Sequence, residues 1–469
     1  MTVLNLIAYL VLLLSMGYYA ITTLQWYSYK LDRVVFHHTK PWWNLVYFLV
    51  PFALYALVAS VSEYGWVVAL GYLPVFAWWY HGLDKPLVWT QRTWLYFGAL
   101  VVTGLLVAFV APYRTILIPI LLAYGVSVVV EAIRFGGFKR QAQARLERME
   151  DLVVIGVTAS YGKTSIKNFI AHLLAARYRT YATPRSVNTF AGVVKDINVD
   201  LPEDTQVYVV EMGARGRGDI AEIATFVHPH YAVVGQIGPA HIEYFKTLEA
   251  IRDTKMEIVR SSRLKRAWVH TSAHVEPTES ITVFGEEITD VEATLEHTAF
   301  VIDGVRYEAP ILGKFNATNL AAAIYVAREL GIDEATIQAR LATLEPTPHR
   351  LQRIDAGGKI LLDDSFNGNI DGMMASFDLA ATYAGRKVLI TPGLVEADEA
   401  LNKQVAQRAD AVFDLVIVSG DLNYPIFKRY IASERLLKLA TKQEMEAMLA
   451  EQTRPGDLIL FANDAPSFV

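Results

Sequence analysis

Apolar residues are concentrated in the first 130 positions of the chain, where short polar loops separate five long apolar stretches. A helix needs about 20 apolar residues to cross the hydrocarbon core of a bilayer, with a range of about 17 to 25. Tryptophan and tyrosine gather at the ends of the stretches, as at membrane interfaces. The pattern predicts a transmembrane helical region over residues 1–135, with about five helices. The stretches are Val3–Leu24, Trp43–Ser60, Trp66–Tyr80, Leu95–Ala111 and Ile116–Val130.

Basic residues alternate between the loops that join these stretches. The first loop, the third loop and the segment after the fifth stretch contain several lysines or arginines, whereas the second has only Glu63 and the fourth only Arg114. Because basic loops stay in the cytoplasm, we expect the N-terminus outside and everything after residue 132 in the cytoplasm. No basic region precedes the first stretch and no small-residue cleavage site follows it, so we do not expect a cleaved signal. The alternative, a buried helical bundle of a soluble protein, leaves the charge alternation unexplained.

The hydrophobic pattern ends abruptly after the fifth stretch. Residues 136–150 read GGFKRQAQARLERME, in which two glycines precede a charged, helix-favouring run. This run predicts a linker helix between the membrane region and the rest of the chain.

From Asp151 onward, short apolar runs alternate with amphipathic segments. LVVIGVT predicts a buried strand, and KTSIKNFIAHLLAARY predicts a helix whose apolar residues recur at helical spacing. This alternation is typical of α/β proteins with mostly parallel sheets. Two prolines in EPTPHR, residues 345–350, divide the region into two α/β units, 151–346 and 347–469. The other expected strands are QVYVVEMG, YAVVGQIG, KILLDDSFNGN, KVLITPGLVE, DLVIVSG and DLILFAND.

Composition excludes several classes of function. The 469 residues have a net charge of −5, so no overall basicity favours a nucleic-acid partner. The chain has no cysteine, which excludes disulfides, thiolate catalysis and cysteine-ligated zinc.

The segment GVTASYGKTSIKN, which begins at residue 156, has the features of a phosphate-binding loop. It follows an expected strand and opens an expected helix, whose first N–H groups attract anions. Lys163 would reach the β- and γ-phosphates of a nucleotide, and the Thr164 hydroxyl would bind Mg²⁺. The standard loop has a further glycine five residues before Gly162, where this chain has Val157.

Two more polar residues follow expected strands. Glu211 ends one strand, and His241 lies in PAHIEYF after the next one. Ligands of parallel sheets bind beyond the carboxyl ends of the strands, so these side chains should converge with the loop. Together with Thr164 they predict a Mg²⁺ site, although this ion prefers oxygen to nitrogen ligands.

Eight ordered motifs resemble those of the Mur ligases, the ATP-dependent amide-forming enzymes of peptidoglycan precursor synthesis. The resemblance covers about residues 151–469 and implies a P-loop central ATPase domain and a Rossmann-like C-terminal domain. The loop of this family reads Thr-Gly-x-x-Gly-Lys-Thr, so Val157 is expected and the departure is Ala159. Alanine adopts a positive φ less easily than the usual glycine. The motifs are TASYGKTS, NTFAG, VVEMGA, AHIEYF, TKMEI, GKFNATNLAAAIYVA, PHR and DDSFNGN.

The resemblance also implies roles for individual residues, with ATP and two Mg²⁺ ions as cofactors. Lys255 matches a lysine that is carbamylated in many Mur ligases, and carbamylation would make it a carboxylate-like metal ligand. Residues implied in catalysis are Lys163, Lys255, His241 and Arg350. Those implied in metal binding are Thr164, Glu211, His241 and Lys255. Those implied in nucleotide binding are Ala159, Ser160, Gly162, Lys163, Thr164, Ser165, Asn316, Asn319, Arg350 and Asp364. Those implied in substrate placement are Asn188, Thr189 and Asn367.

The motifs are most similar to the branch that adds D-Ala-D-Ala to UDP-MurNAc-tripeptide through an acyl phosphate. The resemblance implies these substrates, a bacterial inner-membrane location with cytoplasmic catalytic domains, and cell-wall synthesis proteins as partners. Members of this branch usually begin with a soluble UDP-binding domain, where this chain has apolar stretches, and they tend to end in a basic segment, where it reads LFANDAPSFV. Two alternatives stay open: a Mur-like ligase for a lipid-linked or polyglutamate-type substrate, and a membrane NTPase without ligase activity.

Overall fold

The computed structural model describes residues 3–463 except positions 28, 37, 39, 63, 84, 111–114, 240–244, 367, 396 and 440–443. The chain divides into two compact units, residues 1–140 and 141–469, which are considered separately below.

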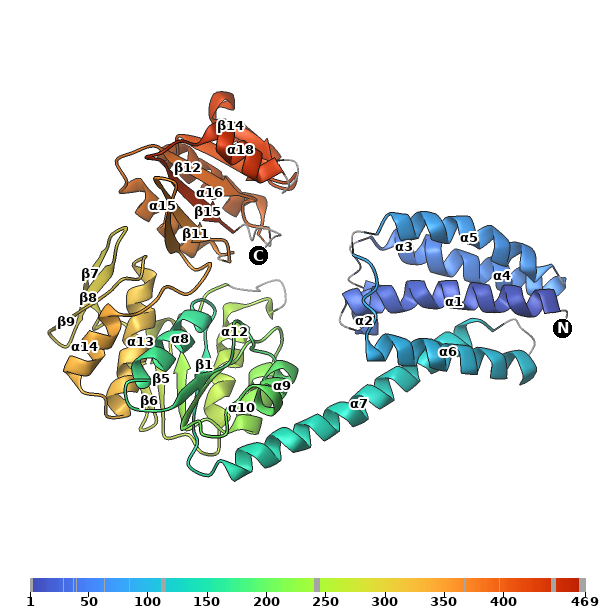
Figure 1. Cartoon of the computed structure of the whole chain (residues 1–469), viewed down its shortest axis with the longest axis horizontal. Coiled ribbons are helices and arrows are strands. Elements are labelled where there is room, and N and C mark those ends of the chain that lie inside the picture. The colour runs from blue at the N-terminus through green and yellow to red at the C-terminus, as the bar shows by residue number, and fades with distance from the viewer. Residues whose placement is uncertain are drawn as a thin grey trace. The chain divides into compact units, whose positions relative to one another are not determined.

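The first unit is helical, and all five predicted apolar stretches form helices in it (Figure 1). Among the described residues, four helices are long and apolar enough to cross a membrane, by length and composition. They are Val3–Trp26, Trp42–Val61, Gln91–Val110 and Leu117–Arg148, whereas α5 has 17 residues. The elements are α1 (Val3–Trp26), α2 (Leu31–Phe36), α3 (Trp42–Asn44), the π-helical η1 (Leu45–Leu49), α4 (Val50–Val61), α5 (Gly65–His81), α6 (Gln91–Val110) and α7 (Leu117–Arg148).

Two glycines allow α1 and α6 to pack closely. A Cβ on Gly17 would lie 2.3 Å from Leu100 Cδ2, and a Cβ on Gly104 would lie 2.3 Å from Leu13 Cδ2. Small residues of this kind let helix backbones approach each other when lipid supplies no hydrophobic driving force. The two glycines therefore set the short distance between these helices.

The charged run 136–150 is helical over most of its length, but it is not a separate helix. It continues α7 without interruption from the fifth apolar stretch to Arg148. Gly136 and Gly137 do not end the helix, although each costs about 1 kcal/mol relative to alanine. Long helix-favouring runs on both sides outweigh that cost.

The second unit begins with a parallel six-stranded sheet in the order β2-β3-β1-β4-β5-β6. Its strands read as continuous apolar runs because helices cover both faces. Figure 1 shows α8 and α13 on one side of the sheet, and α9, α10 and α12 on the other. The strands are β1 (Val153–Thr158), β2 (Thr180–Ala182), β3 (Val207–Glu211), β4 (Tyr231–Val234), β5 (Arg266–His270) and β6 (Ile281–Phe284). The helices are α8 (Lys163–Leu174), α9 (Phe190–Val199), α10 (Asp219–Val227), α12 (Leu248–Lys255), η2 (Met256–Arg260) and η3 (Thr271–Ala273).

A small antiparallel sheet, which the sequence analysis did not predict, follows the parallel one. It has the order β7-β8-β9 and packs beside α13 and α14. Residues of α8, α13 and β8 share one hydrophobic core with the parallel sheet. The elements are β7 (Thr289–Ala293), β8 (Thr298–Ile302), β9 (Val305–Ala309), α13 (Phe315–Glu329) and α14 (Glu334–Ala342).

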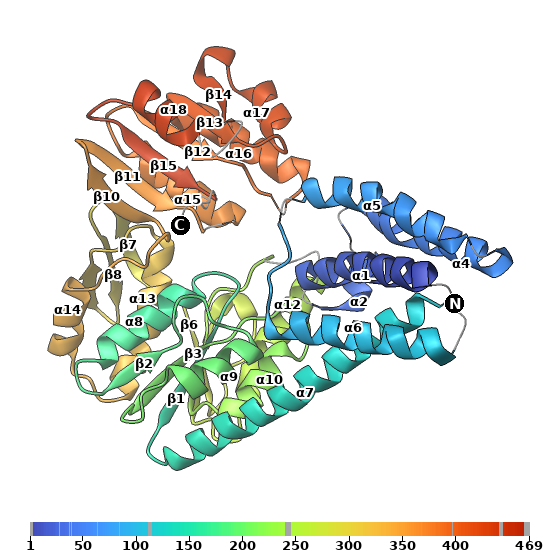
Figure 2. The same cartoon turned by 45° about the vertical axis from the view of Figure 1, so that its right-hand side comes forward.

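The C-terminal part of the unit has a second six-stranded sheet, in the order β10-β11-β15-β12-β13-β14. All neighbours are parallel except β10 and β11. Helices α15, α16 and α17 pack on one face and α18 on the other (Figure 2). The strands are β10 (Gln352–Ala356), β11 (Lys359–Asp364), β12 (Lys387–Thr391), β13 (Leu415–Ser419), β14 (Leu436–Leu439) and β15 (Leu458–Ala462). The helices are α15 (Ile370–Ala381), α16 (Glu399–Val412), α17 (Tyr424–Tyr430), η4 (Ser433–Arg435) and α18 (Met445–Gln452).

Candidate active site

The predicted phosphate loop joins β1 to α8. Gly162, the residue before α8, has a left-handed backbone with φ +77°. A Cβ there would lie 2.5 Å from Asn319 Oδ1, so the backbone angle and the neighbour both require glycine. Ser160 fixes the loop to the segment after β4. Its N–H donates to the Gln236 carbonyl at 2.9 Å, and its hydroxyl donates to the Gly238 carbonyl at 3.0 Å.

Ala159 was expected to be the costly position of this loop. Among the described residues, those with a positive φ do not include Ala159, so the expected strain does not arise. The left-handed turn occurs at Gly162 instead. The alanine side chain is fully buried, and its Cβ lies 3.0 Å from the point that a Cβ on Gly235 would occupy. The loop therefore accepts alanine because a glycine faces it.

Lys163 folds back over the loop. Its Nζ donates to the carbonyls of Ala159 at 2.9 Å and Ser160 at 3.1 Å. Burial lowers the pKa of Lys163, the Glu211 carboxylate opposes that shift, and the nearby Arg350 guanidinium adds to it. The ammonium is held beside the N-terminus of α8, where backbone N–H groups attract phosphate.

Glu211 is the centre of a buried polar network at the end of β3. Its Oε2 accepts from the Thr164 hydroxyl at 3.0 Å and lies 3.4 Å from Lys167 Nζ. Its Oε1 accepts from Asn188 Nδ2 at 2.9 Å. The backbone N–H of Glu211 donates to the Thr183 hydroxyl at 3.1 Å. Three donors, two on α8 and one at Asn188, thus fix the orientation of this carboxylate.

Lys167 was missed by the sequence analysis, although a signal for it was present. It follows Lys163 by four positions, and residues at that spacing share one face of a helix. Its side chain is 1% exposed, and Nζ also donates to the Thr183 carbonyl at 2.6 Å. Burial lowers the pKa of Lys167, and Glu211 opposes that shift.

Lys255, at the end of α12, lies among charged groups of the same network. Burial, and after it the charge of Lys163, lower its pKa to about 7. Asp219, Glu211 and Glu257 oppose the shift. A free lysine has a pKa of about 10.4, so near neutral pH this amine is neutral far more often than a surface lysine.

Glu257, two residues after Lys255, is a second site residue that sequence reasoning missed. Its carboxylate accepts from the N–H of Gly218 at 2.8 Å and from the N–H of Ala221 at 3.0 Å. These donors belong to the start of α10, where the first N–H groups lack partners within the helix. Glu257 therefore joins the Lys255 segment to α10.

Two asparagines at the start of α13 lie against the phosphate loop. Asn319 Nδ2 donates to Asn316 Oδ1 at 2.9 Å, and Asn316 Nδ2 donates to the Leu312 carbonyl at 2.7 Å. The contact of Asn319 with Gly162 brings this pair beside the loop. Their contact with a nucleotide stays a prediction.

The C-terminal domain contributes Arg350 and Asp364 to the same region. The Arg350 guanidinium donates to the Phe366 carbonyl and lies 5.9 Å from the centre of that ring. Burial lowers the pKa of Arg350, and the charges of Asp364 and Glu211 oppose that shift. The electrostatic link to Glu211 and Lys163 places this arginine within range of the phosphate loop.

Three of the predicted residues have other outcomes. The Thr189 hydroxyl accepts from the Gly192 N–H at 3.3 Å and so caps α9. His241 and Asn367 lie outside the described residues. Among the residues that are described, no three His, Asp or Glu side chains gather to hold a metal ion. Of the predicted metal ligands, the structure brings Thr164 and Glu211 into direct contact and places Lys255 in their electrostatic range.

A cavity of about 460 Å³ lies beside α8, and none of the predicted site residues lines it. Asn168 and His172 line it from the helix, and residues 343–348 line it from the linker between the two domains. It contains none of the predicted metal or phosphate ligands, so the chemical site is defined by the Glu211 network and not by this cavity.

Known proteins match this chain in sequence. A family model described as the Mur ligase middle domain matches residues 157–327. A UDP-N-acetylmuramoyl-tripeptide–D-alanyl-D-alanine ligase from Synechocystis is 29% identical over 324 residues, 66% of this chain and 71% of the relative. The Bacillus subtilis enzyme of the same name is 28% identical over 331 residues, 66% of this chain and 72% of the relative.

Solved structures share the fold. MurF from Thermotoga maritima in complex with ADP aligns with a TM-score of 0.61 and 24% identity, over 70% of this chain and 80% of that one. MurF from Acinetobacter baumannii aligns with a TM-score of 0.62 and 22% identity, over 70% of this chain and 77% of that one. The predicted α/β fold with parallel sheets is thereby confirmed.

Proposed function

Because this chain belongs to the Mur ligase family, we propose that it joins D-Ala-D-Ala to the tripeptide of UDP-MurNAc-tripeptide in an ATP-dependent reaction. The observation that carries this proposal is the Thr164–Glu211 contact at the end of a parallel sheet, with the Lys163 ammonium in electrostatic range of Glu211. Relatives that carry the name of this ligase match two thirds of the chain. The fold also aligns with that of a MurF solved with ADP.

The residues present fit a bound Mg²⁺ ion. The Thr164 hydroxyl and the Glu211 carboxylate offer the oxygen ligands that Mg²⁺ prefers, and they already lie 3.0 Å apart. When bound, the ion would neutralise charge on the phosphates of ATP. Asn188 and Lys167 would keep the Glu211 carboxylate turned towards Thr164.

The remaining side chains would act on the phosphoryl group and on the peptide carboxylate. That carboxylate is a poor electrophile, and its phosphorylation by ATP would give an acyl phosphate that an amine can attack. Lys163 and Arg350 would stabilise the negative charge that develops on the phosphoryl oxygens. Both cations are already within electrostatic range of each other. Exclusion of water by closure of the C-terminal domain would protect the acyl phosphate from hydrolysis.

We propose further that Lys255 is carbamylated. The neutral amine nitrogen attacks the carbon of CO₂ and loses a proton, which leaves a carbamate anion on Nζ. The pKa of about 7 supplies the neutral amine that this step needs. The nearby Lys163 ammonium would stabilise the new negative charge. A carbamate would also give the site another oxygen ligand, and with it the capacity for a second Mg²⁺ ion.

A turnover assay tests the proposed reaction. Detergent-solubilised full-length protein with UDP-MurNAc-tripeptide, D-Ala-D-Ala and Mg-ATP should release phosphate and form one pentapeptide product per ATP, as measured by mass spectrometry. Phosphate release should require both the tripeptide and the dipeptide. ATP hydrolysis without an amide product would contradict the ligase and favour an NTPase.

We propose that the first unit lies in the cytoplasmic membrane, with the catalytic domains on the cytoplasmic side. In the described part of the chain, four helices have the length and composition of membrane spans, and the loops alternate in charge. This unit supports a second candidate function, a ligase for a lipid-linked substrate. In that substrate the MurNAc-tripeptide would carry a polyprenyl diphosphate in place of uridine diphosphate. Assays with both forms of the tripeptide, at equal concentration and in the same detergent, distinguish the two.

Membrane insertion can be tested with single cysteines, because the chain has none of its own. We expect the full-length protein to stay in membranes after an alkaline carbonate wash. In intact spheroplasts, a membrane-impermeant maleimide should label Tyr64→Cys, and it should label Ser262→Cys only after permeabilisation. The reverse labelling pattern would contradict the proposed orientation, and release by carbonate would contradict insertion.

A further inference from the structure

Two exposed arginines follow neighbouring strands of the central sheet. Arg185 comes after β2 and Arg215 comes after β3, and these strands are parallel, with Tyr181 opposite Tyr208. Both arginines therefore lie at the carboxyl edge of the sheet, where Glu211 ends β3. Ligands of such sheets bind at this edge.

The Arg185 loop is attached directly to the Glu211 network. Lys167 Nζ donates to the Arg185 carbonyl at 2.5 Å while its charge pairs with Glu211. Asn188, three residues later, donates to Glu211 Oε1. Arg185 has a left-handed backbone with φ +50°, which is uncommon for a residue with a side chain. The carbonyl of Arg185 thus points to the buried lysine while its side chain is exposed.

The Arg215 loop is held in place as well. The N–H groups of Arg215 and Gly216 donate to Asp219 Oδ2 at 2.8 and 2.9 Å. Two residues before Arg215, the Gly213 N–H donates to the Asn188 carbonyl at 2.8 Å, which joins this loop to the Arg185 loop. The backbones of both arginines are therefore fixed relative to Glu211 and to each other.

Neither guanidinium has a partner among the residues that the structure describes. Within the described part of the chain, the side chains of Arg185 and Arg215 form no ion pair and no hydrogen bond, whereas the neighbouring Arg217 lies 3.8 Å from Asp253. A guanidinium presents paired N–H donors that match the two oxygens of a carboxylate. Two such groups beside the site favour an acidic ligand.

We propose that Arg185 and Arg215 bind a carboxylate of the peptide substrate other than the one that is activated. This inference rests on the proposed function. A peptide of the alanyl-D-glutamyl-2,6-diaminopimelate type, named for one structural relative, has free carboxylates close to its reacting end. The distal carboxylate of diaminopimelate is on the reacting residue itself, and the free carboxylate of glutamate is on the residue before it, so an arginine beside the reacting group could reach either.

Two carboxylates of the peptide could be the one that the arginines bind, and peptides that lack one or the other distinguish them. One is the α-carboxylate of the glutamyl residue, which amidation removes. The other is the distal carboxylate of diaminopimelate, which lysine lacks. We expect the full-length wild-type enzyme to prefer one free acid by about tenfold in kcat/KM, since a charge-assisted contact to a carboxylate contributes about that much. Arg185→Ala and Arg215→Ala should each remove most of that preference.

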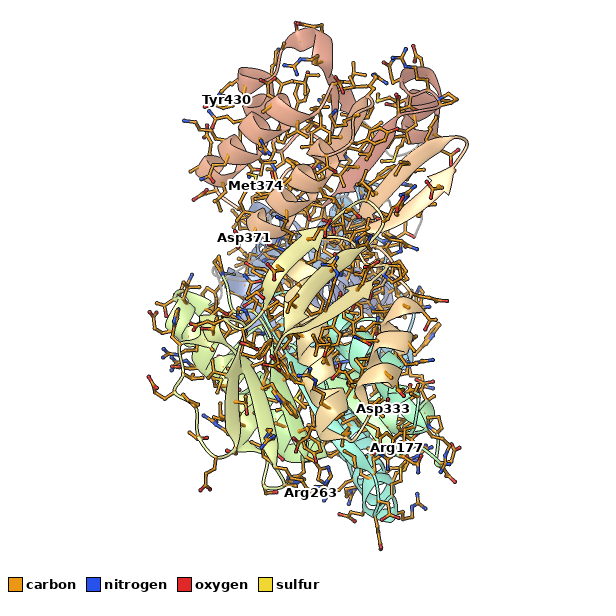
Figure 3. All side chains as sticks on the ribbon, turned by 90° about the vertical axis from the view of Figure 1, so that its left-hand side faces the viewer. Arg177, Arg263, Asp333, Asp371, Met374 and Tyr430 are labelled. Atoms are coloured by element: carbon orange, nitrogen blue, oxygen red, sulfur yellow. The ribbon has the colours of Figure 1, made fainter. Side chains whose placement is uncertain are left out.

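The affected parameter identifies the role. KM for the peptide should rise about tenfold in either variant, while KM for ATP should change by less than about threefold. Arg185→Lys keeps the charge without the paired donors. Its KM for the peptide should therefore lie between that of the wild type and that of Arg185→Ala. Arg263→Ala is the matched control: this exposed arginine lies at the far end of the central domain, as Figure 3 shows, and both parameters should match those of the wild type.

The outcomes separate this inference from the function on which it rests. Suppose that the wild type turns over the peptides with equal kcat/KM for free and amidated glutamate, and for diaminopimelate and lysine. The proposed role of the two arginines is then wrong, but the proposed ligase function is not contradicted. The same holds if both alanine variants keep the preference of the wild type. If the wild type forms no product with any of these peptides, the proposed function itself is contradicted, and the inference falls with it.

Discussion

Replacement of Lys163 by alanine should lower kcat at least about 100-fold, the scale of losing one charged contact to a transition state. In the structure its ammonium rests on the carbonyls of Ala159 and Ser160, beside the first turn of α8. A bound phosphate would offer that ammonium a stronger acceptor than two neutral carbonyls. Without a nucleotide, the Lys163 ammonium is therefore held in the loop by weak contacts. Loss of this side chain should reduce phosphoryl transfer more than it reduces the stability of the fold.

Turnover and thermal unfolding measured together test this prediction. Lys195→Ala removes an exposed lysine from α9 and serves as the control, with activity like that of the wild type. The unfolding temperature of Lys163→Ala without nucleotide should stay within a few degrees of the wild type, because only two loop contacts are lost. More than a tenth of the wild-type kcat in this variant would show that Lys163 does not carry the phosphoryl charge.

Replacement of Lys255 by alanine should abolish most activity, and a small carboxylate such as acetate should restore part of it. The variant leaves space where the proposed carbamate would lie, and a free carboxylate can fill that space with the same charge. Lys255→Arg should not respond to acetate, because the guanidinium stays charged and occupies the space. Activity measured against acetate concentration tests the proposal, and equal responses of the two variants would contradict it.

The pKa of Lys255 also sets the pH dependence of stability. In the folded chain this pKa is about 7, well below its value in the unfolded chain. Between about pH 7 and pH 10 the unfolded chain binds one more proton, so this group makes the free energy of unfolding rise with pH. In CO₂-free buffer, Lys255→Met should therefore gain most in unfolding temperature below pH 7, and the gain should shrink towards pH 10. A gain that does not depend on pH would contradict the lowered pKa.

Much of the fold could be predicted because its signals are local. LVVIGVT is apolar up to its last residue and becomes β1, buried on both faces, and the Gly-Lys-Thr after it begins α8 as expected. The end of the fifth apolar stretch was harder, since two glycines there suggest a break that α7 does not make. The β7-β8-β9 sheet was missed because its strands are short and partly polar, and only their pairing stabilises them.

Site residues could be predicted where a short motif by itself indicates a chemical role. Thr164 and Glu211 are examples, and the structure places them in contact. Lys167 and Glu257 were missed because their roles depend on partners far away in sequence. Lys167 finds its partner only because β3 brings Glu211 beside α8. Glu257 finds its partners only because α10 begins next to it. A sequence pattern shows which residues could be charged, but long-range packing decides which of them are buried together.

The contrast between Gly162 and Ala159 bears on how this loop can change in evolution. At Gly162 a mutation to any larger residue meets two obstacles at once, the left-handed backbone and the side chain of Asn319. A compensating change at Asn319 would remove only the steric obstacle and would leave the backbone strain. We therefore expect substitutions at Gly162 to be very rarely tolerated. At Ala159 a methyl group already fits against Gly235, and no backbone penalty opposes it. A lineage could thus exchange glycine for alanine there in one neutral step, without losing the loop.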